Sequence, residues 1–354
     1  MEIPATNKIL VLVVDDSAVI RGLWSKLIDG IVDMKVVGTA VNGAAALEFL
    51  KRNSVDIVIL DLEMPEMDGL TALPIMLDRH PKIKVIIASA LTTKGSEMAI
   101  NALTLGASDY IAKPTSLSLS NGVKEVSEEL LKKIRILAPG ESRKEINPII
   151  KMPAMKITGK ENFKALVIGT STGGPNALAV VLKNLTSSFD LPIIIVQHMP
   201  AYFIVALAER INRETKRPCQ VVVDGDKIEN GVIYIAPGDF HTVIEKSGNA
   251  ISFKLNKEPA ENFCRPAVDP LFRSAAKVYG PELLAVILTG MGEDGKRGCE
   301  EVQKVGGTIV AQDEASSVVW GMPGAVARAG LATAVLALGD IAHYVEKVVK
   351  GERV

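Results

Sequence analysis

Carboxylates follow two apolar runs in the first part of the chain, at positions where they could hold a metal ion. Asp15 and Asp16 follow the run KILVLVV, and Asp61 ends VDIVILD. If both runs are parallel strands, their carboxyl ends lie at one edge of the sheet, where ligands bind in open α/β folds. Hard oxygen ligands with open water positions suit Mg²⁺. The alternative is that Asp15 and Asp16 only cap the helix that follows them.

Two further polar residues end the next two apolar runs. Ser89 ends KIKVIIAS, and Lys113 ends ASDYIAK and precedes Pro114. At the same edge of the sheet, the Lys113 ammonium would offset the charge of a phosphoryl group, and the Ser89 hydroxyl would donate a hydrogen bond to it. The series therefore predicts one polar site with room for a metal ion and a phosphoryl group.

A glycine-rich turn in the second half of the chain presents a serine that could act as a nucleophile. The segment KALVIGTSTG runs from a strand into a GxSxG pattern, and an apolar helix follows. The flanking glycines permit a tight turn that exposes Ser171, and Pro175 suits the first turn of the helix. Ser171 would lie at the positive end of the helix dipole. Such a turn can also cradle phosphate, but the P-loop ending and the GxGxxG fingerprint are both absent.

A serine nucleophile needs a general base and a carboxylate that orients the base. Of the four histidines, His198 follows the apolar strand LPIIIVQ and is the predicted base, because it lies at the same sheet edge as Ser171. His241, after PGDF, is the competitor. Glu293 and Asp294 follow the strand ELLAVILTG, and either could orient the base. Asp294 could instead cap the next helix.

Short β-branched runs alternate with amphipathic stretches in both halves, which is typical of parallel sheets with helical crossovers. We expect a flavodoxin-like (βα)5 domain at 8–125, a closing helix and linker at 126–162 with the linker itself at 139–162, and a second domain at 163–350. The second domain is predicted to be doubly wound, mostly parallel α/β. Its antiparallel hairpin addition is assigned to GVIYIAP and HTVIEKSGNAISFKL, with a turn at Ser247-Gly248-Asn249.

Length and composition narrow the function classes. A chain of 354 residues favours two domains. Lysine plus arginine (40) balances aspartate plus glutamate (41), which argues against a nucleic-acid partner. Cys219, Cys264 and Cys299 have neither disulfide nor zinc spacing and are predicted to be reduced thiols. The apolar run 9–14 is too short for a signal peptide, so we expect a soluble cytoplasmic protein without membrane insertion.

The strand-end series in the first half resembles the response-regulator receiver domain. The resemblance implies that Asp61 accepts phosphate from a histidine kinase and that Asp15, Asp16 and Asp61 hold Mg²⁺. It further implies that Ser89 and Lys113 sense the phosphoryl group and that Tyr110 occupies the aromatic switch position. The segment Ala88-Ser89-Ala90 departs from the pair of serines that the family more often has.

The second half resembles the catalytic domain of the chemotaxis protein-glutamate methylesterases, the CheB family, through the segments GTSTGGP, QHMP, APGDFH, LTGMGEDG and QDEASSVVWGMP. The resemblance implies that Ser171 is the nucleophile, His198 the general base and Asp294 its orienting carboxylate. Thr172 and Met291 fall at positions that the family places beside the oxyanion.

What the resemblance implies for activity is hydrolysis of glutamyl methyl esters on methyl-accepting chemotaxis receptors, with deamidation of receptor glutamines through the same acyl intermediate. The esterase step would need no cofactor. The implied partners are the receptors and a chemotaxis histidine kinase, with recruitment to receptor clusters. We expect the unphosphorylated receiver to cover the Ser171 cleft and phosphate on Asp61 to favour the open arrangement.

Other functions remain open on the sequence alone. A receiver with a DNA-binding output would need a basic helix-turn-helix segment, and the second half offers strands and glycine loops instead. A receiver with a non-catalytic binding module is a further alternative. A third alternative keeps the serine site but acts on another acyl substrate, such as a small ester.

Overall fold

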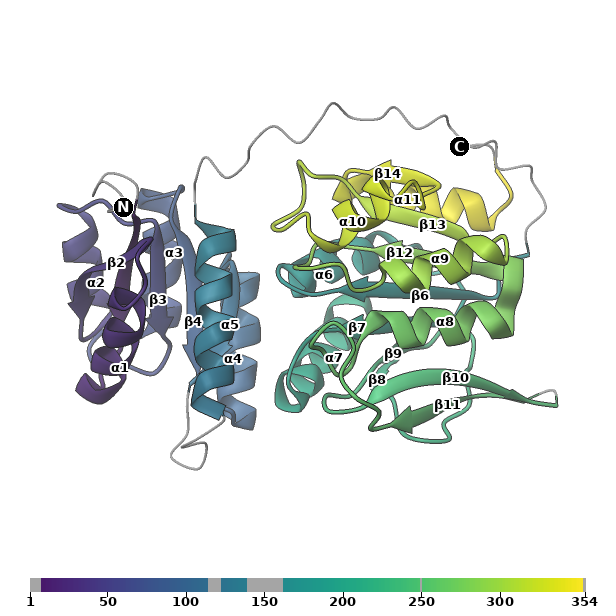
Figure 1. The fold of residues 1–354 in the computed structure, drawn as a ribbon, viewed down its shortest axis with the longest axis horizontal. Coiled ribbons are helices and arrows are strands. Elements are labelled where there is room, and N and C mark those ends of the chain that lie inside the picture. The colour runs from purple at the N-terminus through teal and green to yellow at the C-terminus, as the bar shows by residue number, and fades with distance from the viewer. Residues whose placement is uncertain (1–7, 114–121, 139–161, 249, 353–354) are drawn as a thin grey trace. The chain divides into compact units, whose positions relative to one another are not determined.

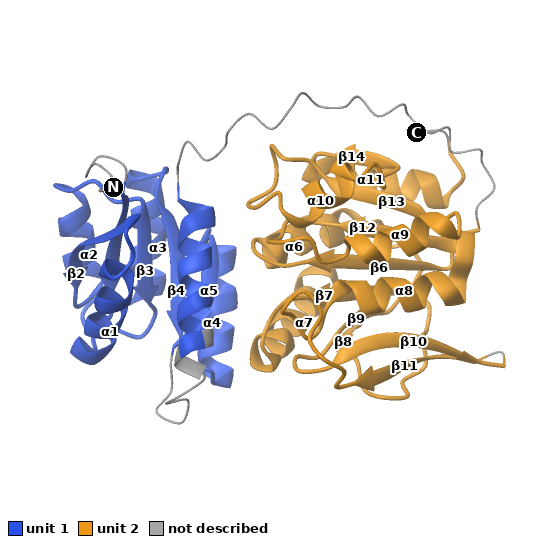
Figure 2. Ribbon diagram, viewed as in Figure 1, with its two compact units in different colours: residues 1–148 blue, residues 149–354 orange. Residues whose placement is uncertain are grey.

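The computed structural model describes residues 8–113, 122–138, 162–248 and 250–352. The chain divides into two compact units, which are Met1–Pro148 (unit 1) and Ile149–Val354 (unit 2) (Figure 2). The predicted linker at 139–162 lies outside the described residues except for Asn162, and so does Pro114. The predicted boundary at residue 125 falls inside a helix that ends at Leu137.

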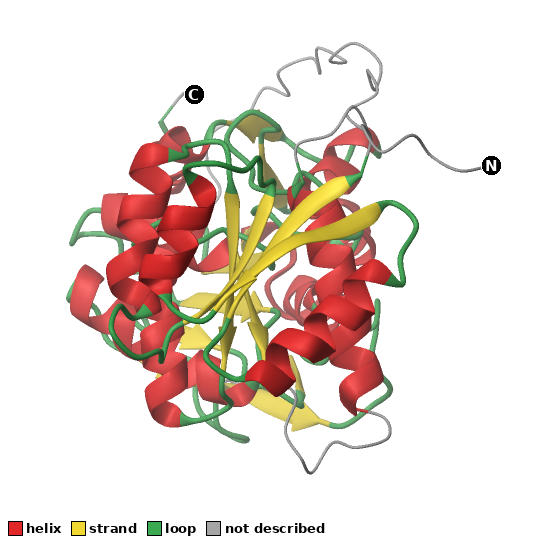
Figure 3. Cartoon of the chain, turned by 90° about the vertical axis from the view of Figure 1, so that its left-hand side faces the viewer, coloured by secondary structure: helices red, strands yellow, loops and turns green. Residues whose placement is uncertain are grey.

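Unit 1 is a parallel sheet with helical crossovers, as the sequence predicted (Figure 1). Its elements in chain order are β1 (Ile9–Val14), α1 (Ala18–Asp29), β2 (Met34–Ala40), α2 (Gly43–Leu50), β3 (Ile57–Asp61), α3 (Gly69–Arg79), β4 (Lys84–Ser89), α4 (Thr93–Thr104), β5 (Asp109–Ala112) and α5 (Gly122–Leu137). The strands are apolar and mostly buried, because helices cover the sheet on both faces (Figure 3).

The strand order β2-β1-β3-β4-β5 explains where a ligand site can form. The crossover through α1 leads from β1 to β2 on one side of it. The later crossovers lead across the sheet towards β5, in the opposite direction. Right-handed connections therefore put α1 on one face and α2, α3 and α4 on the other. The order reverses at β1, so the crevice outside the carboxyl ends of β1 and β3 is the expected ligand site.

Unit 2 contains a seven-stranded parallel sheet and a separate two-stranded antiparallel hairpin. Its elements are β6 (Ala165–Thr170), α6 (Gly174–Asn184), β7 (Ile193–Gln197), α7 (Ala201–Thr215), β8 (Cys219–Val221), β9 (Ile233–Ile235), β10 (His241–Ser247), β11 (Ala250–Asn256), α8 (Val268–Tyr279), the 3-10 turn Gly280–Glu282, β12 (Leu283–Ile287), α9 (Lys296–Lys304), β13 (Thr308–Gln312), α10 (Met322–Arg328), β14 (Ala334–Leu336) and α11 (Leu338–Val349).

The sheet of unit 2 has the order β14-β13-β12-β6-β7-β9-β8, and its direction of winding reverses at β6. The carboxyl ends of β12, β6 and β7 therefore surround the second expected ligand site. The core beneath it includes Val167, Val196 and Ile287, which are fully buried. The apolar strands thus fix which loops meet at this edge.

One strand assignment was wrong. The segment GVIYIAP was predicted to belong to the hairpin addition, but β9 pairs in parallel with β7 and β8 in the main sheet. All three residues of β9 are buried, which is the pattern of a strand covered on both faces rather than of a half-exposed hairpin strand. The hairpin consists of β10 and β11, with Ser247 paired to Ala250, and Asn249 of the predicted turn lies outside the described residues.

A buried lysine on α5 binds two residues of β5 in unit 1. The Nζ atom of Lys133 lies 2.6 Å from the backbone oxygen of Tyr110, 3.3 Å from Asp109 Oδ2 and 2.8 Å from Glu129 Oε1. The same ammonium lies 4.6 Å from the centroid of the Tyr110 ring. Burial lowers the pKa of Lys133, but the charges of Asp109 and Glu129 outweigh it and leave the pKa above its ordinary value. Lys133 therefore stays charged and neutralises Asp109.

We predict that Lys133→Met lowers the free energy of unfolding of unit 1 by about 3 kcal/mol, because it leaves the buried Asp109 carboxylate without a counter-charge. The chain has two tryptophans, so in a Trp320→Phe background Trp24 fluorescence reports the urea unfolding of unit 1. The exposed Lys82→Met is the matched control. Equal midpoints for the two variants would contradict the prediction.

Candidate active site and acidic regulatory site

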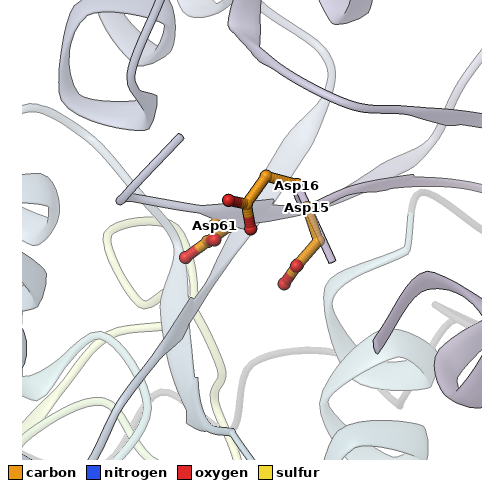
Figure 4. Close-up of side chains that lie close together, drawn as sticks. All are labelled: Asp15, Asp16 and Asp61. Carbon is orange, nitrogen blue, oxygen red and sulfur yellow. The ribbon is translucent and has the colours of Figure 1, made fainter. Parts of the chain in front are cut away.

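Three carboxylates meet at the carboxyl ends of β1 and β3, as the strand-end argument predicted (Figure 4). Asp15, Asp16 and Asp61 each offer a ligand oxygen, and these oxygens lie within 4.8 Å of one another. Asp15 and Asp61 are buried, and Asp16 is exposed. Ser17, rather than either aspartate, is the N-cap of α1. The helix-capping alternative therefore does not account for the position of these carboxylates.

Lys113 lies between the two buried carboxylates. Its Nζ atom is 2.8 Å from Asp15 Oδ2 and 2.7 Å from Asp61 Oδ2. Burial lowers the pKa of Lys113. The two carboxylates raise this pKa by more than burial lowers it, so it lies above its usual value. For Asp61, burial is the largest cause and raises the pKa, although Lys113 opposes this shift. A buried, strand-end carboxylate beside a fixed ammonium can accept a phosphoryl group whose charge the ammonium then offsets.

The other two predicted members of this site lie nearby but bind elsewhere. Ser89 is the last residue of β4, and its hydroxyl donates to the backbone oxygen of Gly95 at 2.8 Å. Tyr110 lies on β5, is 5 % exposed, and has its ring beneath the Lys133 ammonium. Burial raises the pKa of Tyr110 well above its ordinary value. In this structure, Ser89 is bonded to the first turn of α4 and Tyr110 is packed inward.

The acidic cluster fits Mg²⁺ by its donor chemistry. Its carboxylate oxygens are hard ligands, and the exposed Asp16 leaves the site open to water on one side. Asp15, Asp16 and Asp61 would hold the ion, whose charge would assist the binding of a phosphoryl group at Asp61.

The predicted serine lies on a tight turn between β6 and α6. Gly173, with φ of 77°, is the N-cap of α6, and its left-handed conformation is one that glycine adopts without strain. The Ser171 backbone is fixed on both sides, because its N–H donates to the oxygen of Thr289 at 3.1 Å and its oxygen accepts from Gln197 Nε2 at 2.9 Å. The turn therefore holds the serine at the edge where β6, β7 and β12 end.

Thr289 joins the three loops of this edge, and sequence reasoning did not single it out. Its hydroxyl donates to the oxygen of Thr172 at 2.9 Å and accepts from the N–H of Val319 at 2.9 Å. Its N–H donates to Gln312 Oε1 at 2.8 Å. Thr289 is 1 % exposed. Its buried N–H and hydroxyl are therefore satisfied by these bonds rather than by water. Its position two residues after β12 was the only signal in the sequence.

His198 and Asp294 meet across this edge. His198 Nε2 lies 2.8 Å from Asp294 Oδ2, although the two residues are 96 positions apart. Glu293 is exposed and faces Lys296 at 3.5 Å. Of the two carboxylates that the sequence left open, Asp294 is therefore the one that contacts the histidine. The N-cap of α9 is Gly295, so Asp294 does not serve as that cap.

The Asp294 carboxylate accepts four further hydrogen bonds. Oδ2 accepts from the N–H of Val268 at 2.7 Å, and Oδ1 accepts from Asp269 N at 3.1 Å, Gly295 N at 2.9 Å and Asn262 Nδ2 at 2.9 Å. Burial raises the pKa of Asp294, but His198 and these donors lower it more, so the pKa lies below its usual value. The neighbouring Asp269 is buried beside this charge, and both causes raise its pKa to about 6.

A cysteine contacts the other ring nitrogen of His198. Cys264 Sγ lies 3.4 Å from His198 Nδ1, and this contact was not predicted from the sequence. Burial lowers the pKa of His198, but the charges of Cys264 and Asp294 raise it, and the pKa reaches about 10. Within the described residues, no hydrogen bond joins the Ser171 hydroxyl to His198. A proton donor to Nδ1 would therefore have to displace the thiol.

The competing base, His241, is bound within its own turn. It is 1 % exposed, its Nδ1 accepts from the N–H of Ala267 at 3.2 Å, and its Nε2 lies 3.1 Å from the oxygen of Pro259. Both nitrogens are engaged with backbone groups. The geometry therefore favours His198 as the base.

Two backbone N–H groups beside Ser171 are available as donors. Within the described residues, neither Thr172 N nor Met291 N donates a hydrogen bond. Thr172 directly follows the serine, and Gly290, which precedes Met291, is so close to Ser171 that an added Cβ would lie 2.9 Å from the serine Cβ. Free N–H groups in such positions can stabilise an oxyanion. Ser171, His198, Asp294 and these two donors together form an arrangement suited to acyl transfer.

Both units match known protein families. Residues 166–345 match the family model of the CheB methylesterase, and residues 11–120 match that of the response regulator receiver domain. A protein-glutamate methylesterase/protein-glutamine glutaminase of Azospirillum brasilense is 45% identical, covering 96% of this chain and 93% of the relative. One of the same name from Paramagnetospirillum magneticum is 46% identical, with 98% and 97% covered.

Among solved structures, the catalytic domain of the Thermotoga maritima CheB methylesterase superposes with a TM-score of 0.51 and 41% identity. It covers 53% of this chain and 98% of that domain. In the part of the chain that the structure describes, no helix is long and apolar enough to span a bilayer.

We predict that Cys264→Ala lowers the pKa of His198 from about 10 towards the ordinary value of 6.5, because the variant removes a group that favours the protonated ring. NMR titration of the imidazole resonances measures the shift. Cys219→Ala, which alters a thiol on β8, is the control. An unchanged midpoint for Cys264→Ala would mean that the thiol does not set the pKa of the base.

Proposed function

Because the chain belongs to the CheB methylesterase family, we propose that it hydrolyses glutamate 5-O-methyl esters on methyl-accepting chemotaxis receptors to glutamate and methanol. It also deamidates receptor glutamines. The observation that carries the proposal is the His198–Asp294 hydrogen bond of 2.8 Å at the strand edge that holds Ser171. The protein acts in sensory adaptation, in the cytoplasm at receptor clusters.

The proposed mechanism is acyl transfer through Ser171. When the Cys264 thiol leaves Nδ1, one of the causes of the raised His198 pKa is removed. His198 in its neutral form then takes the hydroxyl proton at Nδ1 while Asp294 accepts from Nε2, and the serine oxygen attacks the ester carbonyl carbon. The N–H groups of Thr172 and Met291 stabilise the oxyanion. His198 then returns the proton to the leaving methoxide, and methanol departs. Water attacks the acyl-enzyme by the same route and releases the glutamate.

Deamidation uses the same residues. The glutamine carbonyl is attacked by Ser171, and His198 protonates the amide nitrogen so that ammonia leaves. The acyl intermediate is identical to the one formed from the methyl ester. The esterase step as proposed uses these side chains, the backbone N–H groups of Thr172 and Met291, and water, without a cofactor.

Unit 1 controls this reaction by phosphorylation of Asp61. A chemotaxis histidine kinase supplies the phosphoryl group, and Asp15, Asp16 and Asp61 hold Mg²⁺. Support comes from the cluster of three carboxylates and from Lys113, which contacts two of them. A phosphoryl group would replace the carboxylate contact of Lys113 at Asp61, while Ser89 and Tyr110 would respond as switch residues.

We predict that Ser171→Ala lowers methanol release by about 10⁴-fold or more, because the acyl intermediate can no longer form. The measurement uses membranes that carry methyl-labelled chemoreceptors, with the intact protein, a small phosphodonor and Mg²⁺. Cys219→Ala is the matched control, and Cys264→Ala tests the other nucleophilic side chain that contacts His198. Activity that survived in Ser171→Ala and vanished in Cys264→Ala would make the cysteine the nucleophile.

For the regulatory site, we predict that Asp61→Asn abolishes the rise in methanol release that the phosphodonor produces and leaves the unstimulated rate in place. The carboxylate is the only group at this position that can form the acyl phosphate, and the asparagine keeps its size. Asp68→Asn, at the N-cap of α3, is the control and should keep the stimulation. Stimulation of Asp61→Asn equal to that of the parent protein would refute control through Asp61.

A further inference from the structure

A buried glutamine side chain connects the segment of the serine with the segment of the histidine. Gln197 is the last residue of β7, where it pairs with Thr170, the last residue of β6. Its Nε2 atom donates to the backbone oxygen of Ser171 at 2.9 Å and to the backbone oxygen of His198 at 3.3 Å. Gln197 is 1 % exposed. One carboxamide therefore binds the main chain of both the proposed nucleophile and the proposed base.

This carboxamide acts where the backbone pairing of β6 and β7 ends. Within the described residues, the bond of 3.2 Å from His198 N to the oxygen of Thr170 is the last backbone hydrogen bond between the two segments. The chain then turns into α6 after Ser171 and into the loop before α7 after His198. The Gln197 side chain therefore joins two segments that the sheet itself no longer holds together.

The other end of the carboxamide has no partner. Gln197 Oε1 is buried and lacks a hydrogen bond within the described residues. A buried acceptor without a partner lowers stability, and native proteins contain few of them. Exchanging the amide nitrogen and oxygen would not help, because Oε1 would then face the oxygens of Ser171 and His198. The carboxamide is thus present at a cost in stability, which is common for groups that serve a site rather than the fold.

The first turn of α6 limits where this side chain can lie. A Cβ atom added to Gly174 would overlap Gln197 Oε1 and would lie 2.5 Å from Thr170 Oγ1. The N–H of Gly174 donates to the same Ser171 oxygen at 2.8 Å. Gly174 therefore lets the helix pack directly against the carboxamide, which leaves Gln197 little room to move.

We propose that Gln197 is a positioning residue, whose carboxamide holds the backbones of Ser171 and His198 at the separation that proton transfer and attack on the ester require. The inference rests on the proposed serine mechanism. The bonds of Gln197 go to backbone oxygens, so it acts through these two residues rather than on the substrate. Reactions between preplaced groups depend steeply on geometry, and a displacement of about 1 Å can lower the rate about 10²-fold.

The decisive variant is Gln197→Met, which replaces the carboxamide by an unbranched apolar side chain of similar size. The assay uses the full-length protein with phosphodonor, Mg²⁺ and membranes that carry methyl-labelled receptors. We expect kcat for methanol release to fall about 100-fold. KM should stay within about twofold, because the groups that contact the substrate are unchanged. The melting temperature should stay within about 8 °C of the parent value, since the variant also removes the unpartnered oxygen.

A second measurement follows the serine without the ester substrate. In the reaction with a fluorophosphonate, the serine oxygen bonds to phosphorus, fluoride leaves, and the hydroxyl proton passes to the histidine. The rate of Ser171 labelling should fall in Gln197→Met about as much as kcat does. Gln197→Glu keeps the shape but turns acceptors towards the two backbone oxygens, so it should lose at least as much. The control is Gln303→Met, which removes an exposed amide that donates to Gly330 from the last turn of α9 and should keep the parent rates.

Parent-like values of kcat and of the labelling rate in Gln197→Met would overturn the inference. It would also fail if KM rose while kcat stayed constant, because the amide would then serve substrate binding. A fall of the melting temperature beyond about 8 °C together with the rates would assign the amide to folding and would reject it as well. If the parent protein were labelled at Ser171 but released no methanol, the methylesterase function would be rejected, and the labelling rates alone would decide on the positioning role.

Discussion

The active site depends on the buried carboxylate of Asp294. It accepts five hydrogen bonds, of which one comes from His198, three from backbone N–H groups and one from Asn262. Each bond to a charged acceptor contributes about 1.5–3 kcal/mol, and together they offset the cost of burying the charge. The same bonds connect the loop between β12 and α9 with α8, with the loop after β7 and with the segment at Asn262. A fixed negative charge therefore sets the orientation of the histidine, and the surrounding loops are positioned by their donors to that charge.

The regulatory site also contains buried carboxylates, but their charge is compensated by a side-chain ammonium. Asp15 and Asp61 are buried beside each other, and the ammonium of Lys113 compensates both charges. This compensating charge is carried by one side chain, whereas the donors to Asp294 are mostly backbone groups. The Asp294 carboxylate is thus held mainly by backbone donors, and the Asp15 and Asp61 carboxylates are held by one shared ammonium. Both sites lie where the winding direction of a parallel sheet reverses.

Sequence reasoning predicted most of the fold and the residues that converge, but it failed where local pattern carried no signal. The apolar runs predicted all five strands of unit 1 and the hairpin β10–β11. The segment of β9 was placed in that hairpin. A strand of three residues is too short for its sequence to distinguish a buried parallel strand from a hairpin strand. Cys264, Asn262 and Thr289 lie in loops, where neither helix nor strand periodicity indicates a direction for the side chain.

By itself, the sequence determined which strand-end residues lie at the carboxyl edge of each sheet. Apolar runs fold as parallel strands, and the polar residue after each run must then lie at the carboxyl edge of the sheet, as Asp61, Ser171 and His198 do. Only the tertiary structure decided that Asp294 rather than Glu293 contacts His198, and that Cys264 lies on the other ring nitrogen. These contacts span 96 and 66 positions of the chain. They depend on how loops pack between strands, and distances set by packing are not encoded in any local spacing.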